Sequence, residues 1–413
     1  MKLRVLPDAK FSCGSCSNCC RHWHVELSAD DVGRIEALAW PVGDPLAGAS
    51  PFFRHGGRTF LAHRADGDCV YLNAANGLCR IHEQFGAEAK PLGCRLYPFQ
   101  IVPTFDNEVT VTARFDCPTV RRNDGAPHGD AVRELTRYAG QMRLPEPFDE
   151  RTRSSFGREQ IEAACEFAGT LMAAFPANDR RALFLALLCD WLQERLAGGA
   201  GDFDRSDLAK AFAELKARVE AAASEAPSRL GLIGRVAFRT LLGMYLRRDE
   251  DVLNGQAGRV RRLLAMISFV LGIGSFKALG VTHPPGSLRA ARRFSPGPAA
   301  RDPNFFELHW RMIRTKLESL QFMGAANRGH DFLSGLRSLA MLYPLVLAAA
   351  KYRAAGRSAP LDSTDIDYGV AAIEHSFGRS AILAQPLVRT LETFLLRREQ
   401  FIRLLSDITG ERV

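Results

Sequence analysis

The stretch that decides the fold is Phe11-Ser12-Cys13-Gly14-Ser15-Cys16-Ser17-Asn18-Cys19-Cys20, which gathers four thiols in one short run. The Gly, Ser and Asn residues between the thiols favour tight turns. A compact loop of this kind can direct several thiols towards one inorganic centre. The stretch therefore predicts a loop that binds a metal or a cluster.

The spacing of these thiols favours an iron–sulfur cluster. Cys-x2-Cys-x2-Cys is the order that wraps a cluster in bacterial ferredoxins, where a remote Cys followed by Pro supplies another ligand. Cys117-Pro118 has that last feature. Cys20 departs from the pattern, because adjacent side chains diverge in an extended or turned backbone. We therefore expect Cys19 and Cys20 to face different centres.

Four further thiols give enough ligands for two four-ligand sites. The candidate ligands are Cys13, Cys16, Cys19, Cys20, Cys69, Cys79, Cys94 and Cys117. One partition assigns Cys13, Cys16, Cys19 and Cys117 to one site and Cys20, Cys69, Cys79 and Cys94 to the other. A single site with spare thiols also fits the spacing.

The distribution of cysteine argues against a disulfide scaffold. Only Cys165 and Cys189 lie outside residues 13–117, and both fall in apolar helical runs that predict inert, buried thiols. Residues 1–8 lack the roughly seven apolar residues of a signal-peptide core, so we expect a cytoplasmic protein. In a reducing cytosol, a dense thiol cluster more often binds metal or performs redox chemistry.

Length and composition predict a globular protein of two domains. The chain has 413 residues, 46% hydrophobic and 24% charged, which excludes a disordered or collagen-like polymer. We place a cysteine-cluster domain at 1–128 and an all-α domain at 129–413.

Residues 1–128 carry 14 basic and 14 acidic side chains, so the whole net charge of +8 lies in the second domain. All but 8 of the 54 cations are Arg, which a GC-rich genome explains as readily as phosphate recognition does.

The first domain is predicted to be a small α+β fold. Ser28 to Asp31 form a capping box that opens a helix over 31–39. A strand is expected over 58–63. The run 99–115 is typical of a hairpin that turns at Asp106-Asn107 and returns Cys117 towards Cys94.

The second domain is predicted to be helical throughout, so helices dominate the chain. The expected helices cover 159–175, 180–196, 208–223, 228–247, 252–271, 305–323, 333–353, 365–377 and 387–408. The connection 282–303, rich in Pro, Gly and Arg, is either a solvated linker or a binding loop. No uninterrupted apolar run reaches about 18 residues, so we expect no membrane span. The run 263–276 is interpreted as a buried core helix, with an interfacial segment as the alternative.

Other side chains near the thiols could tune a centre or replace a ligand. They are His22, His24, His82, Arg21, Arg80 and Arg95. Histidines can bind metal or donate to sulfur, and cations can offset thiolate charge. Exposed or locally satisfied side chains are the alternative interpretation.

Two weaker signals have simple structural explanations. Gly272-Ile273-Gly274 lacks the third glycine of a nucleotide loop and is interpreted as a helix end. No site for S-adenosylmethionine or a dinucleotide is recognisable. Asp367, Glu374 and His375 could serve in acid–base chemistry, but helix capping explains them with fewer assumptions.

Four motifs carry a family resemblance. They are Phe11-x-Cys13-x2-Cys16-x2-Cys19-Cys20-Arg21, Val25-x-Leu27-Ser28-x2-Asp31-Val32-x-Arg34-Ile35, Gly77-x-Cys79-x-Ile81-His82 and Lys90-Pro91-x2-Cys94-Arg95-x-Tyr97-Pro98-Phe99. On these motifs the first 120 or so residues resemble the YkgJ-type cysteine-cluster proteins, which implies a zinc- or iron-chelating domain. The flagellin lysine N-methylases are more distantly similar, with a differently spaced first motif. That resemblance implies iron–sulfur binding with methyl transfer from S-adenosylmethionine.

The function expected from these features is that of an iron–sulfur protein. Four-thiolate sites suit both Zn²⁺ and clusters, and the thiol spacing favours a 4Fe-4S cluster, either structural or electron-transferring. The helical domain would then recognise a protein partner or substrate. One alternative is a protein lysine N-methylase that uses S-adenosylmethionine, and the other is a zinc-stabilised interaction module. The chain would then be an enzyme, either a methyltransferase or an iron–sulfur oxidoreductase, or it would be a binding protein. Nucleic acid is not an expected partner, because no aromatic-rich basic motif is present.

Overall fold

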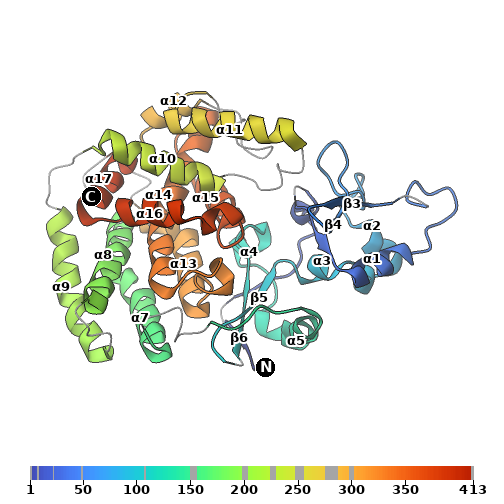
Figure 1. Cartoon of the computed structure of the whole chain (residues 1–413), viewed down its shortest axis with the longest axis horizontal. Coiled ribbons are helices and arrows are strands. Elements are labelled where there is room, and N and C mark those ends of the chain that lie inside the picture. The colour runs from blue at the N-terminus through green and yellow to red at the C-terminus, as the bar shows by residue number, and fades with distance from the viewer. Residues whose placement is uncertain are drawn as a thin grey trace. The chain divides into compact units, whose positions relative to one another are not determined.

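The computed structural model describes residues 2–6, 9–21, 23–47, 50–106, 108–148, 156–197, 203–223, 229–246, 255–274, 287–296 and 302–410. It divides into two compact units. The cysteine unit comprises Pro7–Ile101 and Val111–Arg143, and the helical unit comprises Met1–Leu6, Val102–Thr110 and Leu144–Val413 (Figure 1). The predicted domain boundary after residue 128 stays a prediction.

The cysteine unit is a small α+β fold, as predicted. Its helices are α1 (Ala29–Glu36), α2 (Arg80–Phe85), α3 (Leu92–Leu96), α4 (Pro118–Arg122) and α5 (Val132–Gln141), with 3-10 turns η1 (Asn18–Cys20), η2 (Ala87–Ala89) and η3 (His128–Ala131). Strands β2 (Glu26–Leu27), β3 (Phe52–His55) and β4 (Arg58–Leu61) form an antiparallel sheet in the order β2-β4-β3. Strands β1 (Lys2–Val5), β5 (Phe99–Pro103) and β6 (Glu108–Ala113) form a second sheet in the order β1-β6-β5. Of this sheet, β1 and the hairpin residues Val102–Thr110 belong to the helical unit.

Several predicted elements of this unit are confirmed. Ser28 caps α1 and accepts from the Asp31 amide, while Asp31 accepts from the Ser28 amide, so the capping box is complete. The helix ends at Glu36 rather than at 39. The hairpin at 99–115 is present. Strand β3 was not predicted, because its four residues lack a clear alternation.

The hydrophobic core of the cysteine unit is small and contains sulfur. Its buried members are Val25, Leu27, Ile35, Leu61, Cys69, Tyr71, Leu72 and Ile81. Cys20, Cys79 and Cys94 pack against this set. Thiols therefore occupy the interior positions that aliphatic side chains fill in an ordinary domain.

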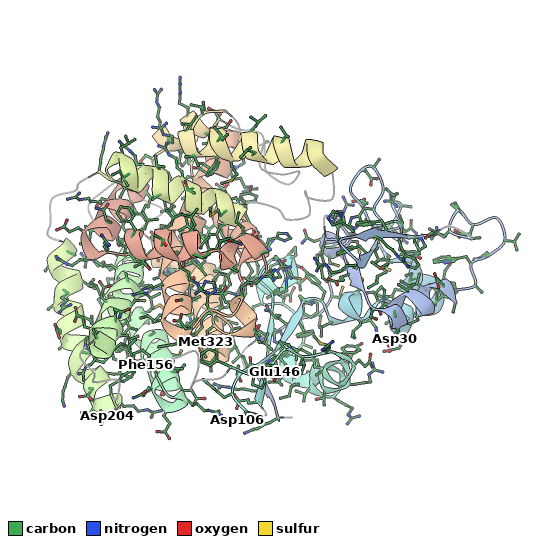
Figure 2. All side chains as sticks on the ribbon, in the orientation of Figure 1. Asp30, Asp106, Glu146, Phe156, Asp204 and Met323 are labelled. Carbon is green, nitrogen blue, oxygen red and sulfur yellow. The ribbon has the colours of Figure 1, made fainter. Side chains whose placement is uncertain are left out.

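The helical unit is built around one long helix. Its helices are α7 (Arg158–Leu171), α8 (Asn178–Ala197), α9 (Arg205–Ala223), α10 (Leu232–Leu246), α11 (Gly255–Leu271), α12 (Leu288–Arg293), α13 (Glu307–Ser319), α14 (Phe332–Arg357), α15 (Ser363–Ser376), α16 (Pro386–Leu395) and α17 (Arg398–Thr409). Helix α14 packs against α8, α12, α15, α16 and α17, and side chains crowd the space between the helices (Figure 2).

Helix α14 is long and apolar enough to cross a membrane by length and composition. However, 89% of its apolar window is buried inside the structure. That burial is typical of the central helix of a globular unit.

Three predictions for this unit were wrong. The single helix expected over 387–408 is two helices, because Leu396 and Arg397 separate α16 from α17. The run 263–276 is not a buried core helix, since its described side chains Leu263, Leu264 and Ile267 are exposed on α11. Part of the connection 282–303 is helical, with Ser287 capping α12, while residues 282–286 and 297–301 lie outside the described residues. The glycine motif is a helix end, as predicted, with Gly272 at φ 69° directly after α11.

Two acidic side chains of α15 stabilise the fold, but Glu374 does so through a buried ion pair and not through helix capping. Glu374 pairs with Lys316 of α13 in the buried interior, with Oε2 2.9 Å from Nζ. Asp365 is fully buried, completes the capping box of α15, and pairs with Arg353 and Arg357. Cys165 and Cys189 are buried, as expected, and desolvation raises their pKa values.

A buried carboxyl group makes the stability of the helical unit depend on pH. Glu392 accepts hydrogen bonds from Tyr245 (3.0 Å) and Ser338 (2.9 Å), and burial raises its pKa from 4.5 to about 7. The folded state thus holds a proton that the unfolded state has lost between these two values. The free energy of unfolding contributed by this group falls as pH rises from 4.5 to about 7 and is constant above that range.

Glu392→Gln is therefore expected to flatten the pH dependence of unfolding across this window, because an amide does not ionise and can accept from one of the two hydroxyls while its NH2 group donates to the other. The variant should gain up to roughly 3 kcal/mol over the natural chain at pH 8. Urea unfolding from pH 4 to 8 measures this, with the exposed Glu399→Gln of α17 as control. Parallel profiles for the natural chain and the Glu392 variant would contradict the assignment.

Candidate metal centre

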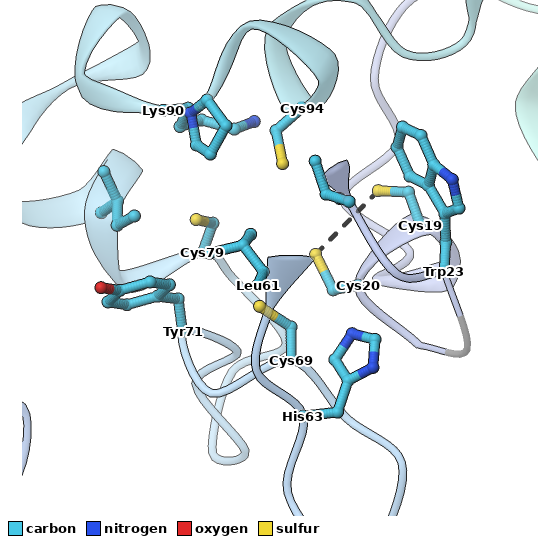
Figure 3. Close-up of a pocket in the computed structure, with 13 residues that line it drawn as sticks. Cys19, Cys20, Trp23, Leu61, His63, Cys69, Tyr71, Cys79, Lys90 and Cys94 are labelled. Atoms are coloured by element: carbon cyan, nitrogen blue, oxygen red, sulfur yellow. Dashed lines mark hydrogen bonds between the residues drawn. The ribbon is translucent and has the colours of Figure 1, made fainter. Parts of the chain in front are cut away.

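Five thiols line one pocket in the cysteine unit (Figure 3). They are Cys19, Cys20, Cys69, Cys79 and Cys94. Apolar side chains of Trp23, Val25, Leu61, Tyr71, Ile81 and Pro91 complete most of the lining, together with His63 and Lys90. Among the described residues that line this pocket there is no Asp or Glu, and five of them are cysteines, so sulfur dominates its donors.

Backbone hydrogen bonds hold three of these cysteines close to one another. The Cys69 amide donates to the Cys20 carbonyl at 2.8 Å. The Leu72 amide donates to the Cys69 carbonyl, and Leu72 forms an isolated bridge with Cys79. These three cysteines come from segments far apart in the sequence, and the backbone alone brings them together.

Cys94 is positioned by helix α3 and by a buried carboxylate. The Leu92 amide at the first position of α3 donates to Asp31 Oδ1 at 2.9 Å. Asp31 also caps α1 and pairs with Arg34 at 2.7 Å. Although burial opposes ionisation, the hydrogen bonds from Leu92, Arg34 and Ser28 hold the pKa of Asp31 below its ordinary value. One carboxylate therefore links α1 to the helix that carries Cys94.

The adjacent thiols do not diverge as predicted. The Sγ atoms of Cys19 and Cys20 are 4.0 Å apart, and both side chains line the same pocket (Figure 3). The expectation failed because these residues end the 3-10 turn η1. In such a turn, successive side chains are only about 120° apart around the axis, whereas they point to opposite faces of a strand.

The remaining three candidate ligands lie in a second group. Cys13 and Cys16 are exposed, and Cys117 is buried at the N-cap of α4. Burial raises the pKa of Cys117, and the neighbouring thiols Cys16 and Cys19 add to this effect. Cys16 and Cys19 are therefore thiol neighbours of Cys117. The hairpin returns the chain beside the segment that follows Cys94, where the Tyr97 hydroxyl donates to Asp116 at 3.2 Å.

Hydrogen bonds fix the loop that carries Cys13 and Cys16. The Ser12 amide donates to the Asp124 carbonyl at 3.2 Å, and the Asn18 side chain donates to the Asp116 carbonyl at 3.3 Å. Ser17 Oγ donates to the Gly77 carbonyl at 2.5 Å. Gly77 has φ 74°, and a Cβ there would lie 2.9 Å from Ser17 Oγ, so this contact requires glycine.

The surroundings of Cys19, Cys69 and Cys94 favour the protonated thiol in the chain by itself. The hydrogen bond shared with Cys20, followed by burial, raises the pKa of Cys19. Burial raises the pKa of Cys69 to about 11 and that of Cys94 well above its ordinary value. The positive charge of Lys90 acts in the opposite direction on Cys19 and Cys94. A thiolate in this pocket needs a further positive charge, which a metal would supply.

The polar side chains flagged around the thiols have other partners or are exposed. His22 lies outside the described residues. Among the others, Arg21 pairs with Asp68 and Arg80 with Asp44, and Arg95 pairs with Glu88 at 2.7 Å, which supports the interpretation of these arginines as locally satisfied. His82 is exposed on α2. The ring nitrogens of His24 and His63 are 3.2 Å apart.

Sequence reasoning missed two side chains of the pocket. His63 was passed over because no cysteine motif contains it, and Lys90 because its motif was used only for the resemblance. The Lys90-Pro91 pair four residues before Cys94 is the signal that could have identified a cation beside the thiols. Among the described residues, no three His, Cys, Asp or Glu side chains already converge on a single point.

Comparison with known proteins identifies the segment that contains these thiols. Residues 12–118 match the CxxCxxCC family model, described as a "Putative zinc- or iron-chelating domain". An uncharacterized protein of Methanocaldococcus jannaschii is 26% identical over 114 residues, which cover 27% of this chain and 37% of that relative. The match thus spans little more than a third of the relative's length. No solved structure matches.

The link through Asp31 predicts that its loss weakens metal binding without removing a ligand. Asp31→Ala leaves the Leu92 amide and Arg34 without their buried acceptor, so the cysteine unit should lose about 1–3 kcal/mol and hold less metal per chain. Metal analysis and thermal unfolding measure the two effects.

Asp30→Ala is the matched control, because Asp30 is the exposed neighbour on the same helical turn (Figure 2). Equal metal content in the two variants would show that Asp31 does not position Cys94.

Proposed function

We propose that this chain, whose residues 12–118 form a cysteine-cluster metal-chelating domain, is an iron–sulfur protein. Cys20, Cys69, Cys79 and Cys94 would hold one cluster in the pocket. The observation that carries this proposal is the gathering of five thiols, with no carboxylate, in one apolar pocket. Soft thiolate donors in such surroundings suit an iron–sulfur cluster.

The spacing of the first cysteine motif supports a cluster over a single zinc ion. Cys13, Cys16 and Cys19 follow one another with two-residue gaps, and the remote Cys117 is followed by Pro118. This order is the one that wraps a cluster in bacterial ferredoxins, whereas zinc sites usually pair two Cys-x2-Cys units.

A second centre would use the other thiol group. Cys117 has Cys16 and Cys19 as thiol neighbours, whereas Cys94 has Cys69, Cys79 and Cys19. Cys19 therefore adjoins both groups, and assigning it to the exposed group leaves four thiols for each centre. Cys13 and Cys16 are exposed, so this second centre would be open to solvent and to a redox partner.

Bound in the buried pocket, a cluster would supply one-electron transfer and would link the core segments of the unit. The chain's own residues set its surroundings. Val25, Leu61 and Ile81 exclude water, and the Lys90 ammonium offsets part of the thiolate charge. Desolvation and a nearby cation are the features by which a protein adjusts the potential of a cluster.

Among the residues that the structure describes, the glycine motif does not support a lysine methylase. The glycine motif at residues 272–274 ends helix α11 and does not follow a strand. We therefore prefer, as the role of the helical unit beside the cluster, recognition of a partner to methyl transfer.

Metal and acid-labile sulfide analysis of anaerobically purified protein tests the proposal. The natural chain should be brown, with matched iron and sulfide. Cys94→Ala and Cys16→Ala should each retain about half of both, because each removes a ligand from a different centre. Cys165→Ala, which alters a buried thiol of the helical unit, should retain all.

A colourless protein with stoichiometric zinc would refute the iron–sulfur proposal. If either Cys94→Ala or Cys16→Ala lost all of its iron, the iron–sulfur proposal would stand but the proposal of a second centre would be refuted.

A further inference from the structure

The outer face of helix α11 is an exposed apolar stripe. Val260, Leu263, Leu264, Ile267 and Leu271 are all exposed, with Leu263 at 62%. Their spacing of three and four residues places them on one side of the helix. A stripe of this kind on a soluble surface marks a contact with something outside the chain.

The opposite face of α11 packs against α10, so the exposed stripe lies on a helix that is part of the folded unit. Phe269 is fully buried. Gly243 of α10 faces Met266 and Phe269, and a Cβ there would lie 3.0–3.1 Å from both side chains. The close approach of the two helices depends on that glycine.

Helices α10 and α12 continue this surface at the C-terminal end of α11. Arg239 of α10 donates to the Val270 and Leu271 carbonyls at 3.3 Å. The Leu288 amide at the start of α12 donates to the Gly274 carbonyl at 3.1 Å. Helix α10 also exposes apolar side chains near its start, namely Leu232, Ile233 and Val236, and Ile233 is 76% exposed.

The three helices are strongly cationic. The described ranges 229–246, 255–274 and 287–296 contain nine Arg and no Asp or Glu. Arg289, Arg292 and Arg293 are exposed on α12. Among the charged side chains that affect the pKa of Arg239, Asp407 of α17 is acidic, whereas Arg292 and Arg235 are cationic like Arg239 itself. This excess of positive charge calls for an anionic partner from outside.

We propose that the α10–α12 face, defined by the exposed apolar side chains of α10 and α11 and the arginines of α12, binds peripherally to an anionic lipid bilayer surface. Aliphatic side chains that project from a helix enter the headgroup boundary, and arginines beside them meet lipid phosphates. The proposal is independent of the cysteine centre.

The chemistry of this face favours a bilayer over a protein partner. An amphipathic peptide helix binds in a groove, whereas the side chains here project outwards. The exposed large apolar residues that the structure describes on this face are Leu, Ile and Val, and the described ranges of the three helices carry Arg but no Asp or Glu. This combination is typical of helices that lie on anionic membranes.

Sedimentation of the full chain with lipid vesicles tests the proposal. The chain should bind phosphatidylcholine vesicles that contain phosphatidylglycerol, bind pure phosphatidylcholine much more weakly, and be released by salt. Leu263→Gln with Ile267→Gln should weaken binding at least about tenfold. Arg289→Gln with Arg293→Gln should weaken it about 30-fold, at about fivefold for each charge.

Matched controls separate this face from general charge and stickiness. Arg205→Gln with Lys210→Gln removes two exposed charges from α9, and Val42→Gln removes an exposed apolar side chain of the cysteine unit. Both controls should bind like the natural chain, and thermal unfolding should be unchanged in all variants because every altered side chain is exposed.

Three outcomes would overturn the proposal. The first is absence of binding to anionic vesicles, and the second is equal loss of binding in the controls. The third is self-association, or capture of an acidic helical peptide, that depends on Leu263 and Ile267 while vesicles stay unbound.

Discussion

The cysteine unit depends on the desolvation of its own thiols. Its core is small, and thiols stand where a larger domain would bury aliphatic side chains. Burial raises the pKa values of Cys69 and Cys94, and the hydrogen bond with Cys20, followed by burial, raises that of Cys19, so a thiolate is unfavourable there without a compensating cation. Metal–thiolate bonds satisfy that requirement and add links between the segments that carry the thiols. Metal chelation and the stability of the unit are thus one property.

The backbone prepares this site in a way that the ligands alone do not reveal. The backbone hydrogen bond from Cys69 to Cys20 and the isolated β-bridge between Leu72 and Cys79 set three ligand positions. Asp31 fixes the start of the helix that carries Cys94. The helical unit needs no such centre, because α14 buries its apolar side chains among the surrounding helices. It follows that loss of metal should affect the two units differently.

Much of this could be predicted from local patterns. The capping box at Ser28, the hairpin at 99–115 and most helices follow from residue types a few positions apart. The helix end at Gly272 follows in the same way. The eight thiols could be identified as candidate ligands, but their grouping could not, because it depends on how distant segments pack. The shared orientation of Cys19 and Cys20 depends on a 3-10 turn that spacing does not reveal. Helix α11 was assigned to the core because hydropathy alone does not distinguish an exposed stripe from a buried one.

The most direct test of the central claim is hydrogen–deuterium exchange of the metal-bound chain and of the same chain after metal removal by a chelator. The account predicts that amides in residues 17–37 and 69–97 exchange at least about a hundredfold faster after removal, while those of α8 and α14 are unchanged. Equal protection of the cysteine unit with and without metal would contradict the claim that thiolate–metal bonds hold it together.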